Sequence, residues 1–149
     1  MFAIDTNIFV YAHNVSSPLL EKAKSFLEQI VADVNGTEKT AIGIPLQVWA
    51  EFVNVCTRQN IGKPLSIPEA IKVVRKHAEL LRIPVIYPKP TQLKTFLSLL
   101  ETTTTTTRKK VFDVALAATL KDNGVDGLYT VNVDDFKDFD FLQVENPLA

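Results

Sequence analysis

Several residue types are scarce in this sequence of 149 residues, and each scarcity excludes a class of protein. The single cysteine, Cys56, cannot form an internal disulfide, so we expect a reducing compartment and a cytoplasmic protein. Cys56 lies in an apolar helical stretch and is expected in the core. His13 and His77 stand apart in the sequence, so no set of histidines and cysteines is available to hold zinc.

Long hydrophobic runs are also missing at the start of the chain. Asp5 interrupts the first apolar run and no basic segment precedes it, so we expect neither a signal peptide nor a membrane-spanning segment. The net charge of −1 excludes a broadly basic nucleic-acid-binding protein, although it allows a local basic patch beside an acidic centre. With 46% hydrophobic residues, the chain has the composition and size of one globular domain, residues 1–149.

Short apolar segments alternate with segments of helical periodicity along the whole chain. Strands are expected at residues 1–4, 40–44, 83–87, 127–131 and 141–144. Helices are expected at residues 18–35, 45–59, 66–81, 93–100 and 108–123, and another directly follows Asp5. This order predicts a parallel sheet with helices on both faces. The six threonines at 102–107 are expected to form a loop, with a hydroxyl-rich lip beside an active site as the alternative.

Asp5 stands at the junction between the first strand and the first helix. In open α/β sheets, ligands bind at the carboxyl ends of the strands, where Asp5 would lie. The alternative is a structural helix N-cap, a position that Asp favours. Asp5 alone does not decide between these two roles.

Two of the expected helices each carry an acid of interest. Glu51 shares a helix face with Gln47 and Arg58, and a solvated polar stripe is the alternative explanation of that face. Asp113 lies in a helix that is apolar on nearly every side, where an ionised carboxylate is costly unless it is paired or bound to metal. Helix capping is the alternative for Asp113 if the regular helix begins only at Val114.

Basic residues precede the helix of Asp113, at Arg108, Lys109 and Lys110. Positive charge at a helix N-terminus opposes the helix dipole, so three such charges indicate a compensating anion such as a phosphate. Solvated charge at a loop-to-helix junction explains them equally well.

The segment 130–136, TVNVDDF, brings further acids to the end of a strand. Turn and cap chemistry explains any one of Asn132, Asp134 and Asp135. It explains less well why each element that should face the same sheet edge carries an acid.

These segments, taken in order, resemble the PIN-domain proteins, and the length resembles the toxin ribonucleases of VapBC-type toxin–antitoxin pairs. The resemblance rests on residues 4–7 (IDTN), Glu51 after Trp49 and Ala50, residues 112–118 (FDVALAA) and residues 130–136. It implies a single-domain, three-layer α/β fold with a five-stranded parallel sheet flanked by helices. It also implies an endoribonuclease that hydrolyses RNA phosphodiester bonds with a metal-activated water. The implied partners are an RNA substrate, a small antitoxin protein and a second copy of the chain in a homodimer.

The resemblance also assigns roles to residues. The acidic core comprises Asp5, Glu51 and Asp113, and the motif's hydroxyl residue is Thr130. Beside these we expect Thr6, Asn7 and Asn132 as supporting residues and, from their charge, Arg108, Lys109 and Lys110 as RNA contacts. Many relatives have an acid two residues after the threonine, where this chain has Asn132. Asp135 matches another commonly acidic position and is the candidate for a fourth carboxylate. Which of Asn132, Asp134 and Asp135 completes the site stays open, and with it the occupancy of a second metal position.

The residue types agree with this chemistry. Clustered carboxylates form an oxygen-only site that suits Mg²⁺ or Mn²⁺ better than zinc. Because close carboxylates repel one another, the cluster should hold a proton or a metal. A catalytically inactive PIN-like module that binds RNA or protein is the main alternative, and Asn132 keeps it open. A phosphohydrolase with Asp5 as nucleophile would want a second acid where this chain has Asn7.

Overall fold

The computed structural model describes residues 1–35, 41–59, 62–103 and 110–149. The strands in this part of the chain are β1 (Phe2–Ile4), β2 (Ile42–Pro45), β3 (Val85–Ile86), β4 (Gly127–Tyr129) and β5 (Gln143–Glu145). The α-helices are α1 (Thr6–His13), α2 (Leu20–Asn35), α3 (Leu46–Cys56), α4 (Ile67–Arg75), α5 (Gln92–Thr102) and α6 (Val111–Asp122). A π-helix, η1 (Lys76–Leu80), continues α4, and a 3₁₀ turn, η3 (Val133–Asp135), follows β4.

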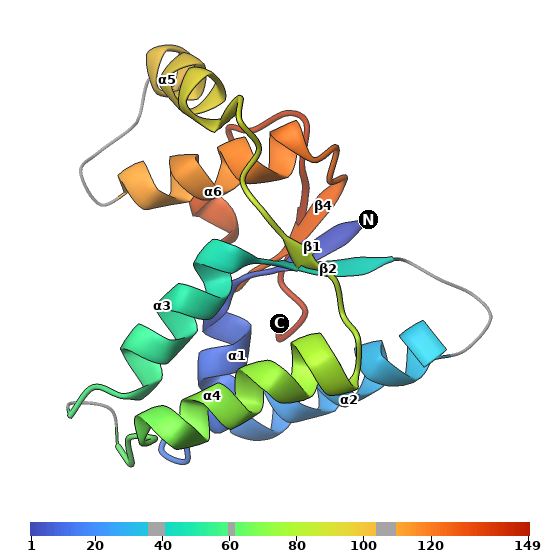
Figure 1. The fold of residues 1–149 in the computed structure, drawn as a ribbon, viewed down its shortest axis with the longest axis vertical. Coiled ribbons are helices and arrows are strands. Elements are labelled where there is room, and N and C mark those ends of the chain that lie inside the picture. The colour runs from blue at the N-terminus through green and yellow to red at the C-terminus, as the bar shows by residue number, and fades with distance from the viewer. Residues whose placement is uncertain (36–40, 60–61, 104–109) are drawn as a thin grey trace.

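The five strands form one sheet in the order β3-β2-β1-β4-β5, and each neighbouring pair is parallel. Figure 1 shows α5 and α6 on one side of the sheet and α1 to α4 on the other. The expected three-layer α/β fold with a five-stranded parallel sheet is therefore confirmed. The chain extends the sheet outward from β1 through β2 to β3 and then crosses to β4 on the other side of β1. The carboxyl ends of β1 and β4 thus flank a topological switch point, where open α/β sheets bind ligands.

An aromatic cluster packs α1 against α3 behind the sheet. The ring of Phe9 lies 4.7 Å from that of Trp49 and 6.4 Å from that of Phe52, and all three side chains are buried. Cys56, at the end of α3, is also buried, as expected, and burial raises the pKa of its thiol to about 11. None of the described helices is both long and apolar enough to span a membrane.

The structure corrects several expected boundaries. Pro45 ends β2 instead of starting a helix, and α3 ends at Cys56, short of the expected Gln59. Thr102 belongs to α5 instead of a loop, and its hydroxyl donates to the backbone oxygens one turn back at Ser98 and Leu99. Residues 104–107 of the threonine run lie outside the described residues.

The helix expected at residues 66–81 divides into two parts. Its capping box is confirmed, since Ser66 Oγ accepts from Glu69 N at 3.2 Å and Glu69 Oε1 accepts from Ser66 N at 3.0 Å. After Arg75 the chain widens into the π-helix η1, closed by Leu81 N donating to Lys76 O at 2.8 Å. Periodicity alone does not reveal this extra residue per turn.

Gly127 is required by a close approach between β1 and β4. It pairs with Phe2, and a Cβ atom at Gly127 would lie 2.3 Å from the Phe2 ring. We predict that Gly127→Ala lowers the free energy of unfolding by about 2 kcal/mol through overpacking. Thermal and urea unfolding would measure the loss. Adding Phe2→Leu should recover part of it, and a Gly127→Ala protein as stable as the parent would contradict the prediction.

Candidate active site

Asp5 lies immediately after β1, and both of its expected roles are present in the structure. Its Oδ1 accepts from Thr6 N at 2.7 Å, so Asp5 is the N-cap of α1. Its Oδ2 accepts from Thr130 Oγ1 at 2.7 Å and from Asn7 Nδ2 at 3.3 Å. The side chain is 7% exposed. A cap normally needs one oxygen, so the second oxygen and its partners are available to a site at the sheet edge.

Thr130 connects the end of β4 to the end of β1. Its side chain is completely buried, and its hydroxyl donates to Asp5 while accepting from Asn7 Nδ2 at 3.1 Å and from Asn132 N at 3.1 Å. Asn7 Oδ1 in turn accepts from Val131 N at 3.3 Å. The hydroxyl therefore has one orientation, and the structure brings Thr130 and Asn7 to the acid that they were expected to support.

Glu51 reaches the same edge from the first half of α3. Its Oε2 accepts from Thr6 Oγ1 at 2.9 Å and its Oε1 accepts from Gln47 Nε2 at 3.0 Å. Gln47 Nε2 also donates to the backbone oxygen of Phe112 at 2.9 Å, which joins α3 to the start of α6. Glu51 is half-buried and held from two sides, so it is not a freely solvated member of the polar stripe. The sequence places Gln47 on this face by its spacing but does not by itself give it a role. Its i, i+4 relation to Glu51 is the signal that indicates the contact.

Asp113 lies in the first turn of α6, where Lys110 occupies the N-cap position. The capping alternative for Asp113 is therefore wrong. Burial, followed by the negative charges of Asp5, Asp135 and Glu51, raises the pKa of Asp113 to about 6, and Lys110 opposes this shift. Burial also raises the pKa of Asp5, against its hydrogen bonds to Thr130 and Thr6. The negative charges of Asp5, Glu51 and Asp135 therefore all act on Asp113, so the four predicted carboxylates lie near one another.

The fourth carboxylate and the basic residues are more loosely placed. Asp135 ends the η3 turn, so it does not cap that turn, and its Oδ1 lies 3.8 Å from Lys110 Nζ. Asn132 precedes the turn with an exposed side chain, and Asp134 is exposed as well. Arg108 and Lys109 lie outside the described residues.

A cavity of about 250 Å³ opens over these groups. Its lining includes three of the predicted acids, the predicted supporting residues of α1, and Asn132, together with apolar neighbours: Asp5, Thr6, Asn7, Val10, Tyr11, Glu51, Val55, Asp113 and Asn132. Asp135 does not line it. The sequence does not predict that Val10, Tyr11 and Val55 line the site, because they have the pattern of ordinary apolar helix positions.

The donor set suits a hard divalent cation, although the described residues contain no group of three acids or histidines already arranged as a metal site. All the charged donors are carboxylates, the ligand type that Mg²⁺ and Mn²⁺ prefer. Lys110 is the described cation that lowers the pKa of Asp113, against three acids that raise it. Half-buried negative charge in this excess favours a bound cation.

The raised pKa of Asp113 predicts a stability change with pH. The folded chain binds this proton more tightly than the unfolded chain, so metal-free stability should fall as pH rises from about 4 to about 6. Asp113→Asn removes the charge and should raise the free energy of unfolding in chelator at pH 7.5 by about 1 kcal/mol, allowing for solvent screening. The gain should vanish near pH 4.

Thermal unfolding in EDTA across this pH range would measure the effect. Asp134→Asn, an exposed acid outside the cavity, is the matched control and should show no such gain. An Asp113→Asn protein less stable than its parent at pH 7.5 would mean that the Asp113 carboxylate is stabilising, against the prediction.

Comparison with known proteins agrees with this geometry. Residues 2–142 match the PIN domain. The chain is 30% identical to Ribonuclease VapC24 of Mycobacterium tuberculosis over 149 residues, which is all of this chain and 98% of the relative.

Solved structures with this fold come from several bacteria. VapC20 of Mycobacterium tuberculosis, described as a toxin that cleaves the sarcin–ricin loop, matches with a TM-score of 0.67 at 12% identity over 93% of this chain and 95% of its own. VapBC2 of Rickettsia felis, bound to a DNA fragment from its promoter, matches with a TM-score of 0.66 at 22% identity over 97% of each chain. At these identities the solved structures show the fold alone. The match over residues 2–142 and the 30% identity over the full length show more: the chain belongs to the PIN-domain family.

Proposed function

We propose that this protein, as one domain over residues 1–149, is a metal-dependent endoribonuclease and the toxin of a toxin–antitoxin pair. One observation carries the proposal: Asp5, Glu51 and Asp113 line a single cavity at the switch point of a PIN-domain sheet. The 30% identity to a ribonuclease over the full length supports RNA as the substrate.

The three lining carboxylates would hold Mg²⁺ or Mn²⁺, with Asp135 as a fourth acid near them. A divalent ion bound there would activate a water and neutralise charge on the scissile phosphate. The chain's own neutral residues orient the carboxylates beforehand. Thr130 and Asn7 fix Oδ2 of Asp5, while Thr6 and Gln47 fix the two oxygens of Glu51. Ligands held in this way need little reorganisation when an ion arrives.

The protonation state of Asp113 should make metal binding at this site depend on pH. With a pKa near 6, its carboxyl is mostly ionised at pH 7 and increasingly protonated below pH 6. A protonated carboxyl no longer binds a cation well, so metal binding should weaken in mildly acid solution. Lys110, at the start of α6, is proposed to contact the RNA phosphates, and Arg108 and Lys109, which precede it in the sequence, are proposed to do the same.

The proposed partners follow from the relatives. A Klebsiella pneumoniae neighbour is a toxin–antitoxin complex, and VapBC2 of Rickettsia felis is bound to a DNA fragment from its promoter. On this basis we propose a small inhibitory protein as a partner of the present chain, and, apart from the relatives, a homodimer. A catalytically inactive RNA- or protein-binding module remains the second candidate, because Asn132 stands where many relatives have an acid.

Cleavage should depend on the metal and on the acidic core. Purified protein incubated with structured and unstructured RNA should cut in Mg²⁺ or Mn²⁺ and stop in EDTA, and Asp5→Asn should reduce cutting by at least about 100-fold while circular dichroism shows a retained fold. Asp134→Asn should cut like the parent. Cutting that persists in EDTA would remove the metal mechanism, and metal binding without any cutting would favour the inactive module.

Asp135 and Asn132 offer a test of how the site is completed. If Asp135 contributes its charge to the metal, Asp135→Asn should weaken Mn²⁺ binding by about tenfold, and Asn132→Asp should tighten it by adding a carboxylate at the cavity wall. Titration of Mn²⁺ into both variants would measure these shifts. Unchanged Mn²⁺ affinity in Asp135→Asn would assign the metal to Asp5, Glu51 and Asp113 alone.

A further inference from the structure

A second polar cavity lies at the opposite end of α1 from the acidic site. It has a volume of about 210 Å³, and its polar lining comprises His13, Lys24, Glu28, Lys76 and His77. Three elements meet there, since these residues belong to α1, α2 and η1. Asp5 caps the start of α1 and His13 ends it, so the two sites are separated by about 12 Å of helix.

Each of the two histidines is held in one tautomer by its own helix. His13 Nδ1 lies 2.8 Å from the backbone oxygen of Phe9, and His77 Nδ1 lies 2.9 Å from that of Val73. A carbonyl oxygen can only accept a hydrogen bond, so each Nδ1 carries a hydrogen. In the neutral rings the other nitrogen, Nε2, therefore carries a lone pair, and protonation would turn it into a donor.

His77 lines the cavity although the residue is only 5% exposed. Within the described parts of the chain no hydrogen bond reaches its Nε2, and Trp49 Nε1 is the one side-chain nitrogen or oxygen there that is both fully buried and unpartnered. Nε2 of His77 must therefore be open to solvent. The rings of Phe9 and Trp49, at 5.3 and 5.6 Å, hold the imidazole in this position.

The charges around the cavity favour an anion over a metal ion. Burial lowers the pKa of both histidines, and the positive charge of Lys76 lowers both further, with Lys24 adding to the effect on His13. The two ammonium groups repel a cation, and Glu28 offsets only part of their charge. The π-helix that carries Lys76 and His77 is a rare feature that is frequent at functional sites.

We propose that this cavity binds a tetrahedral oxyanion, a phosphate group, between Lys24 and Lys76, with Nε2 of His13 and His77 as further donors once the rings are protonated. The cavity volume is below the roughly 300–1,000 Å³ of pockets for drug-sized ligands, so it suits a phosphate group and not a whole nucleotide. The phosphate is either the free ion or a group carried by RNA. This site does not depend on the proposed cleavage.

Sulfate is the probe for the test, because its charge stays constant between pH 5.5 and 7.5. Sodium sulfate would be titrated into the full chain in EDTA, against sodium chloride at equal ionic strength, while NMR follows the histidine Cε1–H signals. Both signals should shift saturably, and the pKa of both rings should rise. By the same linkage, affinity should be at least about fivefold higher at pH 5.5 than at pH 7.5.

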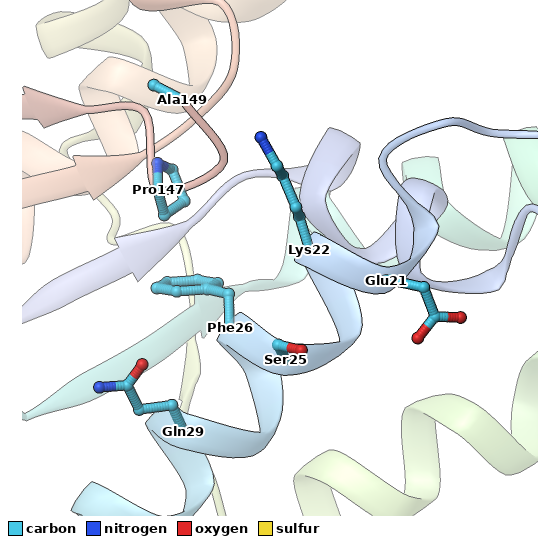
Figure 2. Close-up of a pocket in the computed structure, with 7 residues that line it drawn as sticks. All are labelled: Glu21, Lys22, Ser25, Phe26, Gln29, Pro147 and Ala149. Atoms are coloured by element: carbon cyan, nitrogen blue, oxygen red, sulfur yellow. The ribbon is translucent and has the colours of Figure 1, made fainter.

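Matched variants separate this cavity from general attraction to lysine. Lys24 and Lys76 are exposed, so the double variant Lys24→Gln/Lys76→Gln should fold and lose the saturable response. Lys22→Gln is the control, because Lys22 lies on the same helix but faces a different pocket beside Phe26 and Pro147 (Figure 2). His13→Gln should keep binding at pH 7.5 and reduce its increase at pH 5.5.

The source of the phosphate is distinguished by two further titrations in EDTA. Inorganic phosphate and a short RNA, with or without a 5′-phosphate, would each be added to the parent and the double variant. A histidine response to RNA that the double variant loses assigns the site to RNA, and a response to inorganic phosphate alone assigns it to the free ion. The proposal is overturned if neither sulfate nor phosphate moves the signals saturably, or if the double variant responds like the parent.

Discussion

The buried carboxylate of Asp5 constrains much of the arrangement around it. Removing an ionised carboxylate from water costs several kcal/mol, and hydrogen bonds to a charged group return about 1.5–3 kcal/mol each. Asp5 accepts such bonds from Thr6 N, Asn7 Nδ2 and Thr130 Oγ1. Its pKa is nevertheless raised, so burial and neighbouring acids outweigh the bonds. The site therefore keeps an unfavourable charge that a bound cation would relieve.

The donors to Asp5 set requirements on the fold. Thr130 reaches Asp5 because β4 pairs with β1 in the register that places Tyr129 beside Ile4. Thr6 and Asn7 reach it because α1 begins directly after the strand. The crossover that brings β4 back beside β1 supplies the topology, and the switch point follows from it. The hydrogen bonds that Asp5 needs can therefore form only if β4 lies beside β1 in this register.

The acidic residues of the site could be predicted from local sequence, but the contacts between distant elements could not. Asp5, Glu51, Asp113 and Thr130 each stand next to an element boundary or a helical stripe, where period and cap signals are strong. The joint between Gln47 and Phe112 depends on how α3 and α6 approach, which no local pattern encodes.

The sequence also does not show which polar residues of a helix face are hydrogen-bonded within the protein and which are solvated. Glu51 is held by Thr6 and Gln47, while Asn54 and Arg58 on the same stripe are exposed. The spacing of Val74, Ala78 and Leu81 fits an ordinary α-helix, so it does not reveal the π-helix at Lys76–Leu80.

Net charge is the property from which the least could be read. A value of −1 excludes a broadly basic surface, but it is a sum, and the field that a ligand meets is local. At one end of α1, Asp5 and its acidic neighbours concentrate negative charge, and at the other end His13 lies among lysines. The positive end of the helix dipole lies at Asp5 and stabilises its negative charge. The eight-residue helix α1 therefore lies between a negatively charged region and a positively charged one. The two charges cancel in the net charge of the chain, but each region favours a ligand of the opposite sign.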